Sequence, residues 1–423
     1  MAGSLRRTFA SLRVRNFRLF LAGQLVSGVG TWMQWVASPL LVLHLTHSGT
    51  ALGFDTALTF LPILLFGAWG GVLADRFDNR KLQILTQAGY GLVAFALWLL
   101  VVTGVVEVWM VFTLSFVSGL VSAVDMPTRQ SFYLELVGAE ELTNAMSLNT
   151  ATFTGTRIIG AAVAGAVIAA FGLAPAFLVN AISYLFVIAA LVAMRPTELV
   201  PRHRVAKAKG QIREGIRYVW REKELRIPLL VMLFVFTFAF NFTVLLPLLA
   251  ERTFSGDAGT YGVMLSLFGV GSLSGALFMA GRSSRPAIAR LVGLGVALGV
   301  LGILVAIAPT LLVANLLIVP LGAVGIAFAI TGNSTLQLLS SPELRGRVMA
   351  LYTVVFLGST PIGGTIAGWV GQHLGPRVGL AGGGVIAIAA GLAAVPSLKE
   401  LRTAAPDTLK DEAPAREADP LSA

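Results

Sequence analysis

The stretch Gly70-Gly71-Val72-Leu73-Ala74-Asp75-Arg76-Phe77-Asp78-Asn79-Arg80-Lys81 separates two long apolar runs. Ionised side chains are costly in hydrocarbon, so charges this dense must lie in water or at a lipid surface. The stretch therefore predicts a short polar turn between two membrane-spanning helices. A small residue at Gly71 lets two helix backbones approach closely, and a carboxylate at Asp75 is stabilised beside the positive end of a neighbouring helix.

The composition predicts that most of the chain lies in a bilayer. Of its 423 residues, 56% are hydrophobic and only 12% are charged. A soluble chain would carry about 25% charged residues. Apolar stretches recur from end to end, and a helix needs about 20 mostly apolar residues to span a bilayer. Because these stretches are long and do not alternate, they exclude a barrel and predict an all-α membrane protein.

The charged and metal-binding residue types exclude several functions. The formal net charge is +10, but Lys and Arg are confined to alternate loops, so we expect no nucleic-acid partner. The chain has no cysteine, which excludes disulfides and thiolate metal sites. The histidines fall near predicted loops or helix ends: His44, His47, His203 and His373. We therefore expect no metal and no cofactor.

Twelve apolar segments are predicted to span the membrane, in two groups of six. The first group is 18–45, 53–74, 82–104, 107–127, 143–171 and 173–194; the second is 227–251, 260–281, 286–307, 309–334, 346–372 and 376–397. The chain then divides into a first bundle (1–194), a basic linker (195–226), a second bundle (227–400) and a tail (401–423). The tail is rich in Ala, Pro and charge, which is typical of disorder.

The basic residues predict the orientation of these spans. With the N-terminus inside, cytoplasmic segments hold most of the Lys and Arg, whereas the outer loops hold only Arg252 and Arg377. This asymmetry places both termini in the cytoplasm. The basic cluster from Arg6 to Arg18 precedes a long apolar run without a cleavage site, which predicts a retained first helix. We expect a multi-pass protein of the inner (plasma) membrane.

The linker carries an amphipathic pattern. Its apolar residues recur at helical spacing: Ile212, Ile216, Val219 and Trp220. Basic and acidic residues fill the other positions, which predicts a helix lying on the cytoplasmic membrane surface. The alternative is a tether without a specific function.

The two groups of spans are related in sequence at an offset of 203 positions. The fifth span carries Gly155, Gly160, Ala164, Gly165 and Gly172, and the eleventh carries Gly358, Gly363, Ala367, Gly368 and Gly375. Flanking residues match at the same offset: Met146 with Met349, Leu148 with Leu351, and Phe153 with Phe356. Small residues at such spacing form a smooth stripe for close helix contact. The offset predicts two pseudo-symmetric six-helix bundles related as a parallel repeat.

The pattern Gly71-x-x-x-Asp75-Arg76, followed by Arg80-Lys81, resembles the signature loop of the major facilitator superfamily, although Asp78 and Asn79 depart from the usual residues. A second run resembles its drug–proton antiporter branch, which includes macrolide exporters and the enterobactin exporter. That run is Asp125-x-Pro127-x-Arg129-Gln130, Leu142-x-Asn144-Ala145, Asn149 and Arg157-x-x-Gly160. Exporters of the family often have a Gly-rich fifth helix, but the Pro expected there is replaced by Ala161.

This resemblance implies a monomeric secondary transporter that exports an amphipathic small molecule, drug-like or a siderophore, by proton antiport and alternating access. It also implies a cytoplasmic gate formed by Gly71, Asp75, Arg76, Arg80, Asp125 and Arg129. One alternative is an importer or facilitator on the same scaffold. Another is a membrane receptor or enzyme, but the sequence lacks a catalytic constellation such as His-Glu-x-x-His and lacks a nucleotide-binding loop.

Polar residues inside the spans are candidates for a substrate cavity, because polar groups avoid lipid. The candidates are Gln34, Trp35, Asn149, Arg157, Asn241 and Asn333. Arg157 is expected either to hold an anionic or carbonyl-bearing substrate or to pair with a carboxylate or helix end. Asp55 and Asp125 are candidates for proton coupling, since burial favours the protonated carboxyl. The alternative for Asp55 is an inert position in the outer headgroup region.

Overall fold

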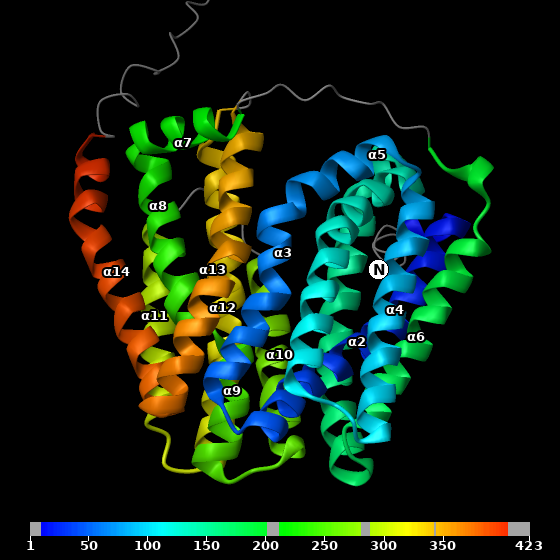
Figure 1. The fold of residues 1–423 in the computed structure, drawn as a ribbon. Helices are drawn as coiled ribbons and strands as arrows, with labels where there is room; N and C mark the ends of the chain where they lie inside the picture. Colours follow the sequence, from blue (N-terminus) through cyan, green and yellow to red (C-terminus); the bar gives the residue numbers. More distant parts are fainter. Residues whose placement is uncertain (1–9, 201–210, 281–287, 342–343, 405–423) are drawn as a thin grey trace, which may run out of the picture.

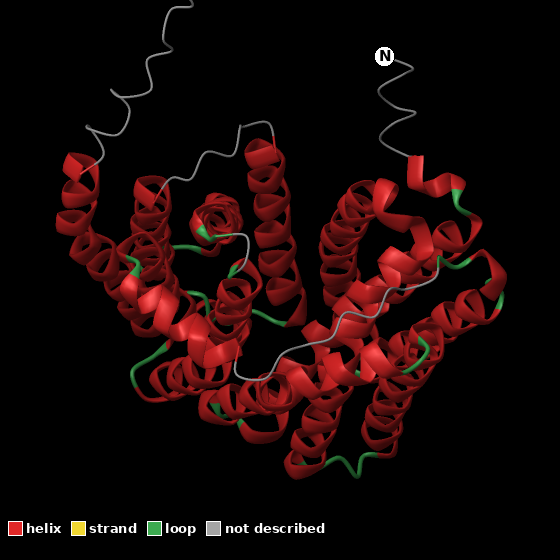
Figure 2. Cartoon of the chain, turned by 90° about the horizontal axis from the view of Figure 1, so that it is seen from above, coloured by secondary structure: helices red, strands yellow, loops and turns green. Residues whose placement is uncertain are grey.

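The computed structural model describes residues 10–200, 211–280, 288–341 and 344–404, and all regular structure in them is helical (Figure 2). The longer helices are α2 (Arg15–Thr46), α3 (Gly49–Arg76), α4 (Asn79–Thr103), α5 (Val108–Phe171), α6 (Ala174–Val192), α7 (Gln211–Arg221), α8 (Lys223–Phe234), α9 (Phe242–Leu248), α10 (Ala258–Ala280), α11 (Ile288–Ala306), α12 (Leu311–Leu339), α13 (Arg345–His373) and α14 (Pro376–Ala404). The tail beyond Ala404 and the linker segment 201–210 lie outside the described residues.

Eleven helical segments of the described chain are long and apolar enough to cross a membrane, and one of them contains two predicted spans. The 64 residues of α5 would extend about 96 Å as one rod, three times the hydrocarbon thickness. The helix instead breaks at Gly138, whose φ of 72° and ψ of 178° are accessible only to glycine. Figure 1 shows α5 rising and then returning. With α5 counted as two segments, the described chain crosses twelve times.

The prediction that the fourth span ends at Pro127 is wrong. The helix continues through Pro127 to the break at Gly138, and the expected loop 128–142 is helical. A proline removes one helical hydrogen bond, but neighbouring helices and Ser or Thr side chains compensate for this inside membranes. Thr128 donates to the carbonyl of Val124 at 2.7 Å beside this proline.

The seventh span is interrupted, which the sequence did not indicate. Its helices α8 and α9 are separated by a π-helical segment, Val235–Ala239, and a second π-helical segment follows α9. Between them Asn241 has a non-helical φ of −92° and ψ of 43°. Its side-chain amide donates to the carbonyl of Thr237 at 2.7 Å, so the break keeps that carbonyl paired.

Helices α2 to α6 pack against one another, as do α8 to α14, and the two groups meet where α3 contacts α13 and α5 contacts α10. We call the end of the molecule that carries α7 the linker face (top of Figure 1) and the other end the opposite face. The cross-group contacts of α3 lie toward the opposite face, where Gly53 meets Gly364 and Gly368. Toward the linker face, Gly70 packs on Ala123 of its own group.

Most of the predicted stripes of small residues make these close contacts. A Cβ at Gly160 would meet Val29 and Trp32 of α2, and one at Gly165 would meet Gly262 of α10. In the other group Gly363 meets Thr237, Gly368 meets Gly49 and Gly53, and Gly358 meets Leu64. Gly155, Gly172 and Gly375 are the exceptions: a Cβ at any of them meets nothing within 4 Å, so the predicted packing role of Gly155 is wrong.

This difference predicts different results for two Gly→Ala substitutions, one at a close contact (Gly363) and one in open space (Gly155). A Cβ at Gly363 would lie 1.9 Å from the carbonyl oxygen of Thr237, and both helix backbones would have to separate. Such overpacking costs about 1–3 kcal/mol. We expect Gly363→Ala to lower the thermal midpoint of the purified protein in detergent and Gly155→Ala to leave it unchanged. Equal midpoints for the two variants would contradict the packing described.

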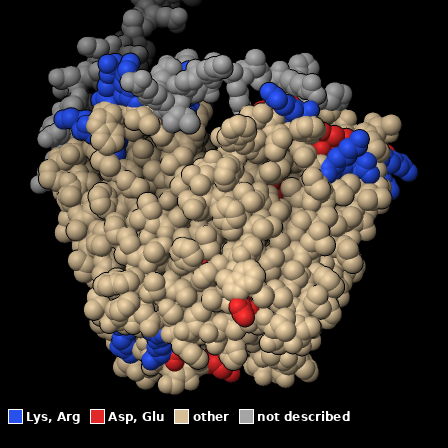
Figure 3. Space-filling model, in the orientation of Figure 1, with Lys and Arg blue, Asp and Glu red and all other residues tan. Residues whose placement is uncertain are grey.

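The surface charges lie at the two ends of the helices. On the face drawn in Figure 3, Lys and Arg lie at the upper and lower edges, with a broad belt between that lacks them. The turn 77–81 is at the linker face, where Asp78 accepts from the backbone N–H of Lys81 at 3.1 Å and caps α4. Asn79 donates to Glu135 at 2.6 Å. The two residues that depart from the family pattern thus cap α4 and tie it to α5.

Candidate functional site

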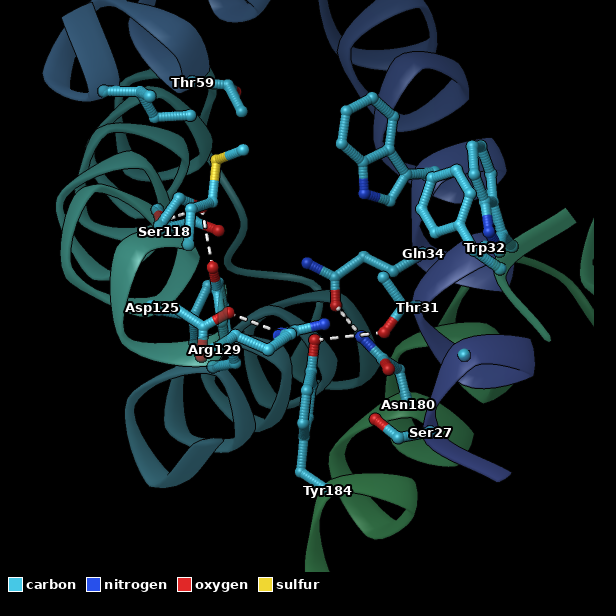
Figure 4. Close-up of a pocket in the computed structure, with 18 of the residues that line it drawn as sticks. Ser27, Thr31, Trp32, Gln34, Thr59, Ser118, Asp125, Arg129, Asn180 and Tyr184 are labelled. Carbon is cyan, nitrogen blue, oxygen red and sulfur yellow. Dashed lines mark hydrogen bonds and ion pairs between the residues drawn. The ribbon is translucent and has the colours of Figure 1, made fainter. Parts of the chain in front are cut away.

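The candidate site is a cavity of about 530 Å³ among the membrane-spanning helices. Its wall comes mostly from α2, α3, α4, α5 and α6, and from the second group it includes Thr243 and Leu357. Figure 4 shows Asp125 and Arg129 on one side, with Trp32 and Gln34 across from them. A cavity of this size accommodates a small molecule of drug-like size.

One wall of the cavity holds a carboxylate that is fully satisfied. Asp125 is only 2% exposed and forms an ion pair with Arg129, one turn further along α5. One of its oxygens also accepts from three donors of α4: Gln83 at 3.1 Å, Thr86 at 2.8 Å and Gln87 at 3.0 Å. Donors and a paired cation stabilise the ionised carboxylate. The ion pair and these hydrogen bonds hold Asp125 against Arg129 and α4.

A second carboxylate at the cavity wall has far fewer partners. Asp55 on α3 is 6% exposed, and the hydroxyl of Ser115 on α5 donates to it at 2.6 Å. Neither the Asp125–Arg129 ion pair nor the Arg195–Glu198 ion pair includes Asp55. The Asp55 carboxyl is buried inside the protein rather than exposed at its surface.

The rest of the wall combines aromatic rings with paired polar groups. The Trp35 ring packs against two others: against Trp32 in a tilted arrangement with a centroid separation of 5.7 Å, and edge-to-face against Phe60 at 6.0 Å. The amide of Asn180 donates to Gln34 at 2.6 Å, and Tyr133 donates to Asn149. Such a wall suits a ligand with both apolar and hydrogen-bonding parts.

Three of the six predicted cavity residues line the cavity, and three do not. Gln34, Trp35 and Asn149 line the cavity, whereas Arg157, Asn241 and Asn333 are not among the lining residues. Asn241 is buried and bonded to its own helix. Asn333 accepts from Gln337 on the same helix at 2.7 Å. Arg157 lies between two aromatic rings, one from each group of helices.

The predicted gate residues lie in three places. Gly71, Asp75 and Arg76 end α3 at the linker face. Arg80 donates to the carbonyl oxygens of Leu191 and Val192 at 2.6 and 2.9 Å, which caps the last turn of α6. Asp125 and Arg129 line the cavity, where Arg129 also donates to Gln24 at 3.3 Å.

The opposite face carries a polar clasp between the two groups of helices that the sequence did not predict. Arg252 donates to the carbonyl oxygen of His47 at 2.7 Å and to the side chain of Gln372 at 2.7 Å. The same Gln372 oxygen accepts from the backbone N–H of Gly49 at 2.7 Å. The turn between α2 and α3 is therefore tied to α13 and to the segment after α9.

Several site residues had a weak signal in the sequence. Gln83, Thr86 and Gln87 are polar at helical spacing within an apolar span, which is the pattern expected for one polar helix face. The partners Ser115 and Asn180 are isolated polar residues in their spans, and only the packing shows what they contact.

The twelve crossings and the membrane-embedded cavity define a polytopic membrane protein with a site for a small solute. The major facilitator family model described as "Transmembrane secretion effector" matches residues 6–418. The chain therefore belongs to this family of the major facilitator superfamily, and its relatives are transporters rather than enzymes.

Curated relatives are distant in sequence. The chain is 23% identical to the enterobactin exporter EntS of Shigella flexneri, covering 91% of this chain and 92% of the relative. It is 25% identical to the staphyloferrin A transporter of Staphylococcus aureus, covering 62% of this chain and 66% of that protein.

Solved structures are similar in fold. A bacterial homologue of the iron transporter ferroportin in an inward-facing state has a TM-score of 0.67 at 15% identity, covering 89% of this chain and 98% of that one. The nucleoside transporter NupG has a TM-score of 0.66 at 13% identity, covering 93% and 99%.

Proposed function

We propose that this protein exports an amphipathic small molecule, drug-like or a siderophore, across the inner membrane by proton antiport. The observation that carries the proposal is the cavity, whose wall joins aromatic rings, paired amides and two buried carboxylates within the membrane-spanning helices. Two relatives are named for siderophores, which supports this class of cargo. A monomer suffices, because one chain supplies the whole cavity wall.

We propose that the molecule is built from two pseudo-symmetric bundles that rock about the cavity. Matched contacts support this: Gly160 meets the first span as Gly363 meets the seventh, and Gly165 meets the eighth as Gly368 meets the second. The clasp of Arg252 and Gln372 joins the bundles at the opposite face. We propose that this face is external, that both termini are cytoplasmic, and that the end of α3 at Asp75 and Arg76 forms part of the inner gate.

We propose Asp55 rather than Asp125 as the proton carrier. Asp125 accepts from Gln83, Thr86 and Gln87 and pairs with Arg129, so its protonation would leave the Arg129 cation without its charged partner. Asp55 accepts from the Ser115 hydroxyl, and a protonated carboxyl remains compatible with that neighbour. A carrier must gain and lose a proton in each cycle, and Asp55 does so with the smaller rearrangement.

The direct test is transport in inverted membrane vesicles. Vesicles that contain the protein and a panel of amphipathic fluorescent dyes are given an acid interior, and dye accumulation is followed. Antiport predicts accumulation that collapses when an ionophore dissipates the pH gradient. Transport that is indifferent to the gradient would remove proton antiport, and movement of dye in the reverse direction would favour an importer.

A further inference from the structure

Midway along the second segment of α5, Arg157 lies between two aromatic rings, with no carboxylate partner among the described residues. The guanidinium carbon of Arg157 lies 5.7 Å from the ring centroid of Trp32 and 5.8 Å from that of Phe268. Among the described residues no acceptor reaches its buried Nε, and neither the Asp125–Arg129 pair nor the Arg195–Glu198 pair includes it. A buried cation is costly unless it is paired, and cation–π contacts offset only part of that cost.

Arg157 borders the cavity. Its neighbours Trp32, Phe153 and Thr156 line the wall, and the Trp32 ring packs on that of Phe153 at 5.4 Å. The residue as a whole is of intermediate exposure, although its Nε is buried. The other arginine at the cavity, Arg129, is already paired with Asp125. Arg157 is therefore the arginine at this site whose N–H groups can donate to a ligand.

We propose that Arg157, with Trp32 and Phe268, forms a subsite for an anionic group of the transported molecule. This inference rests on the proposed function, because it assigns part of the same binding site. A carboxylate or another planar oxyanion fits the paired N–H donors of a guanidinium, which bind such groups in a bidentate way. The aromatic rings then contact the apolar part of the ligand next to its charge.

The subsite is shared between the two groups of helices. Trp32 and Arg157 belong to α2 and α5, whereas Phe268 belongs to α10. On the same interface the hydroxyl of Ser266 donates to the carbonyl oxygen of Ile158 at 3.2 Å. Separation of α5 from α10 takes the Phe268 ring away from the guanidinium. The affinity for an anionic group therefore differs between conformations, which is the requirement for a ligand to shift their populations.

The test compares two probes that differ in charge but little in shape, 1-naphthoate and 1-naphthamide. Binding to the purified full-length protein in detergent is measured by quenching of tryptophan fluorescence. We expect the wild-type protein to bind the anion more tightly than the amide. Arg157→Gln should weaken naphthoate binding by about tenfold or more and leave naphthamide binding unchanged. Arg157→Lys should keep part of the preference, because it retains the charge without the planar donors.

Arg377→Gln is the matched control. Arg377 also lies against an aromatic ring, at 5.9 Å from Phe254, but it is at the opposite face and donates to the carbonyl of Ala308. This variant should bind both probes as the wild type does. No preference for the anion in the wild type, or an equal loss of both probes in Arg157→Gln, would overturn the subsite. Proton-driven dye transport by the same variants in inverted vesicles would still support the proposed function.

Discussion

Replacing Asp55 by Asn should reduce dye accumulation driven by a pH gradient to the level of vesicles without the protein. Asparagine keeps the size and accepts the Ser115 hydrogen bond, but it cannot carry a proton. Exchange of dye at equal pH on both sides requires no proton movement, so it should persist in the variant. The measurement is the initial rate in both assays with the same vesicle preparation.

Two further variants separate this role from a structural one. Asp55→Glu keeps a titratable carboxyl and should retain gradient-driven transport. The double variant Asp125→Asn with Arg129→Gln removes the ion pair as a unit and should also retain dependence on the gradient. If Asp55→Asn transports normally, or if the double variant alone loses coupling, then Asp55 is not the carrier.

Arg129→Ala should cause the largest loss of stability among the site variants. The substitution leaves the Asp125 carboxylate buried without its cation, and breaking a buried pair in this way costs about 3–5 kcal/mol. The three neutral donors from α4 remain, but they cannot supply the missing charge. The measurement is the thermal midpoint of the purified protein in detergent, with retention of monodisperse elution as a second readout.

Arg195 provides the matched control for this prediction. It pairs with Glu198 at 2.9 Å, but both side chains are well exposed, at 63% and 38%. An exposed pair contributes about 0–1 kcal/mol, so Arg195→Ala should change the midpoint little. The double variant Asp125→Asn with Arg129→Gln should recover most of the loss, because no charge is left unpaired. Equal effects of Arg129→Ala and Arg195→Ala would contradict the buried network.

The membrane spans were predictable because each one depends on residues that are close together in the sequence. Length and apolar composition decide whether a helix crosses a bilayer, and the first predicted span, 18–45, became Arg15–Thr46. The Asp125–Arg129 pair was predictable from its spacing of four residues on one helix. The reversal at Gly138 was missed because the polar segment around it resembles a loop in composition.

The inward faces of the helices were not predictable in the same way. In a membrane protein the lipid-facing and the buried faces of a helix are both apolar. The residue pattern therefore identifies the buried face only where a polar residue has a partner there. Asn241 and Arg157 show the limit: both are polar residues in spans, yet one is bonded to its own helix and the other lies between aromatic rings. The break beside Asn241 depends on contacts with α13. There Gly363, which has no side chain, leaves room for the carbonyl oxygen of Thr237.

Alternating access is tested most directly by breaking the clasp at the opposite face. The chain has no cysteine, so spin labels can be placed at chosen sites only. One labelled pair, Val105 and Leu312, reports on the opposite face, and another, Phe77 and Leu338, reports on the linker face; all four side chains are exposed.

Electron–electron distances are compared between the wild-type background and Arg252→Ala, which loses the bonds to His47 and Gln372. The two-bundle account predicts a population in which the Val105–Leu312 distance lengthens while the Phe77–Leu338 distance shortens. A longer distance at the opposite face with an unchanged distance at the linker face would contradict it.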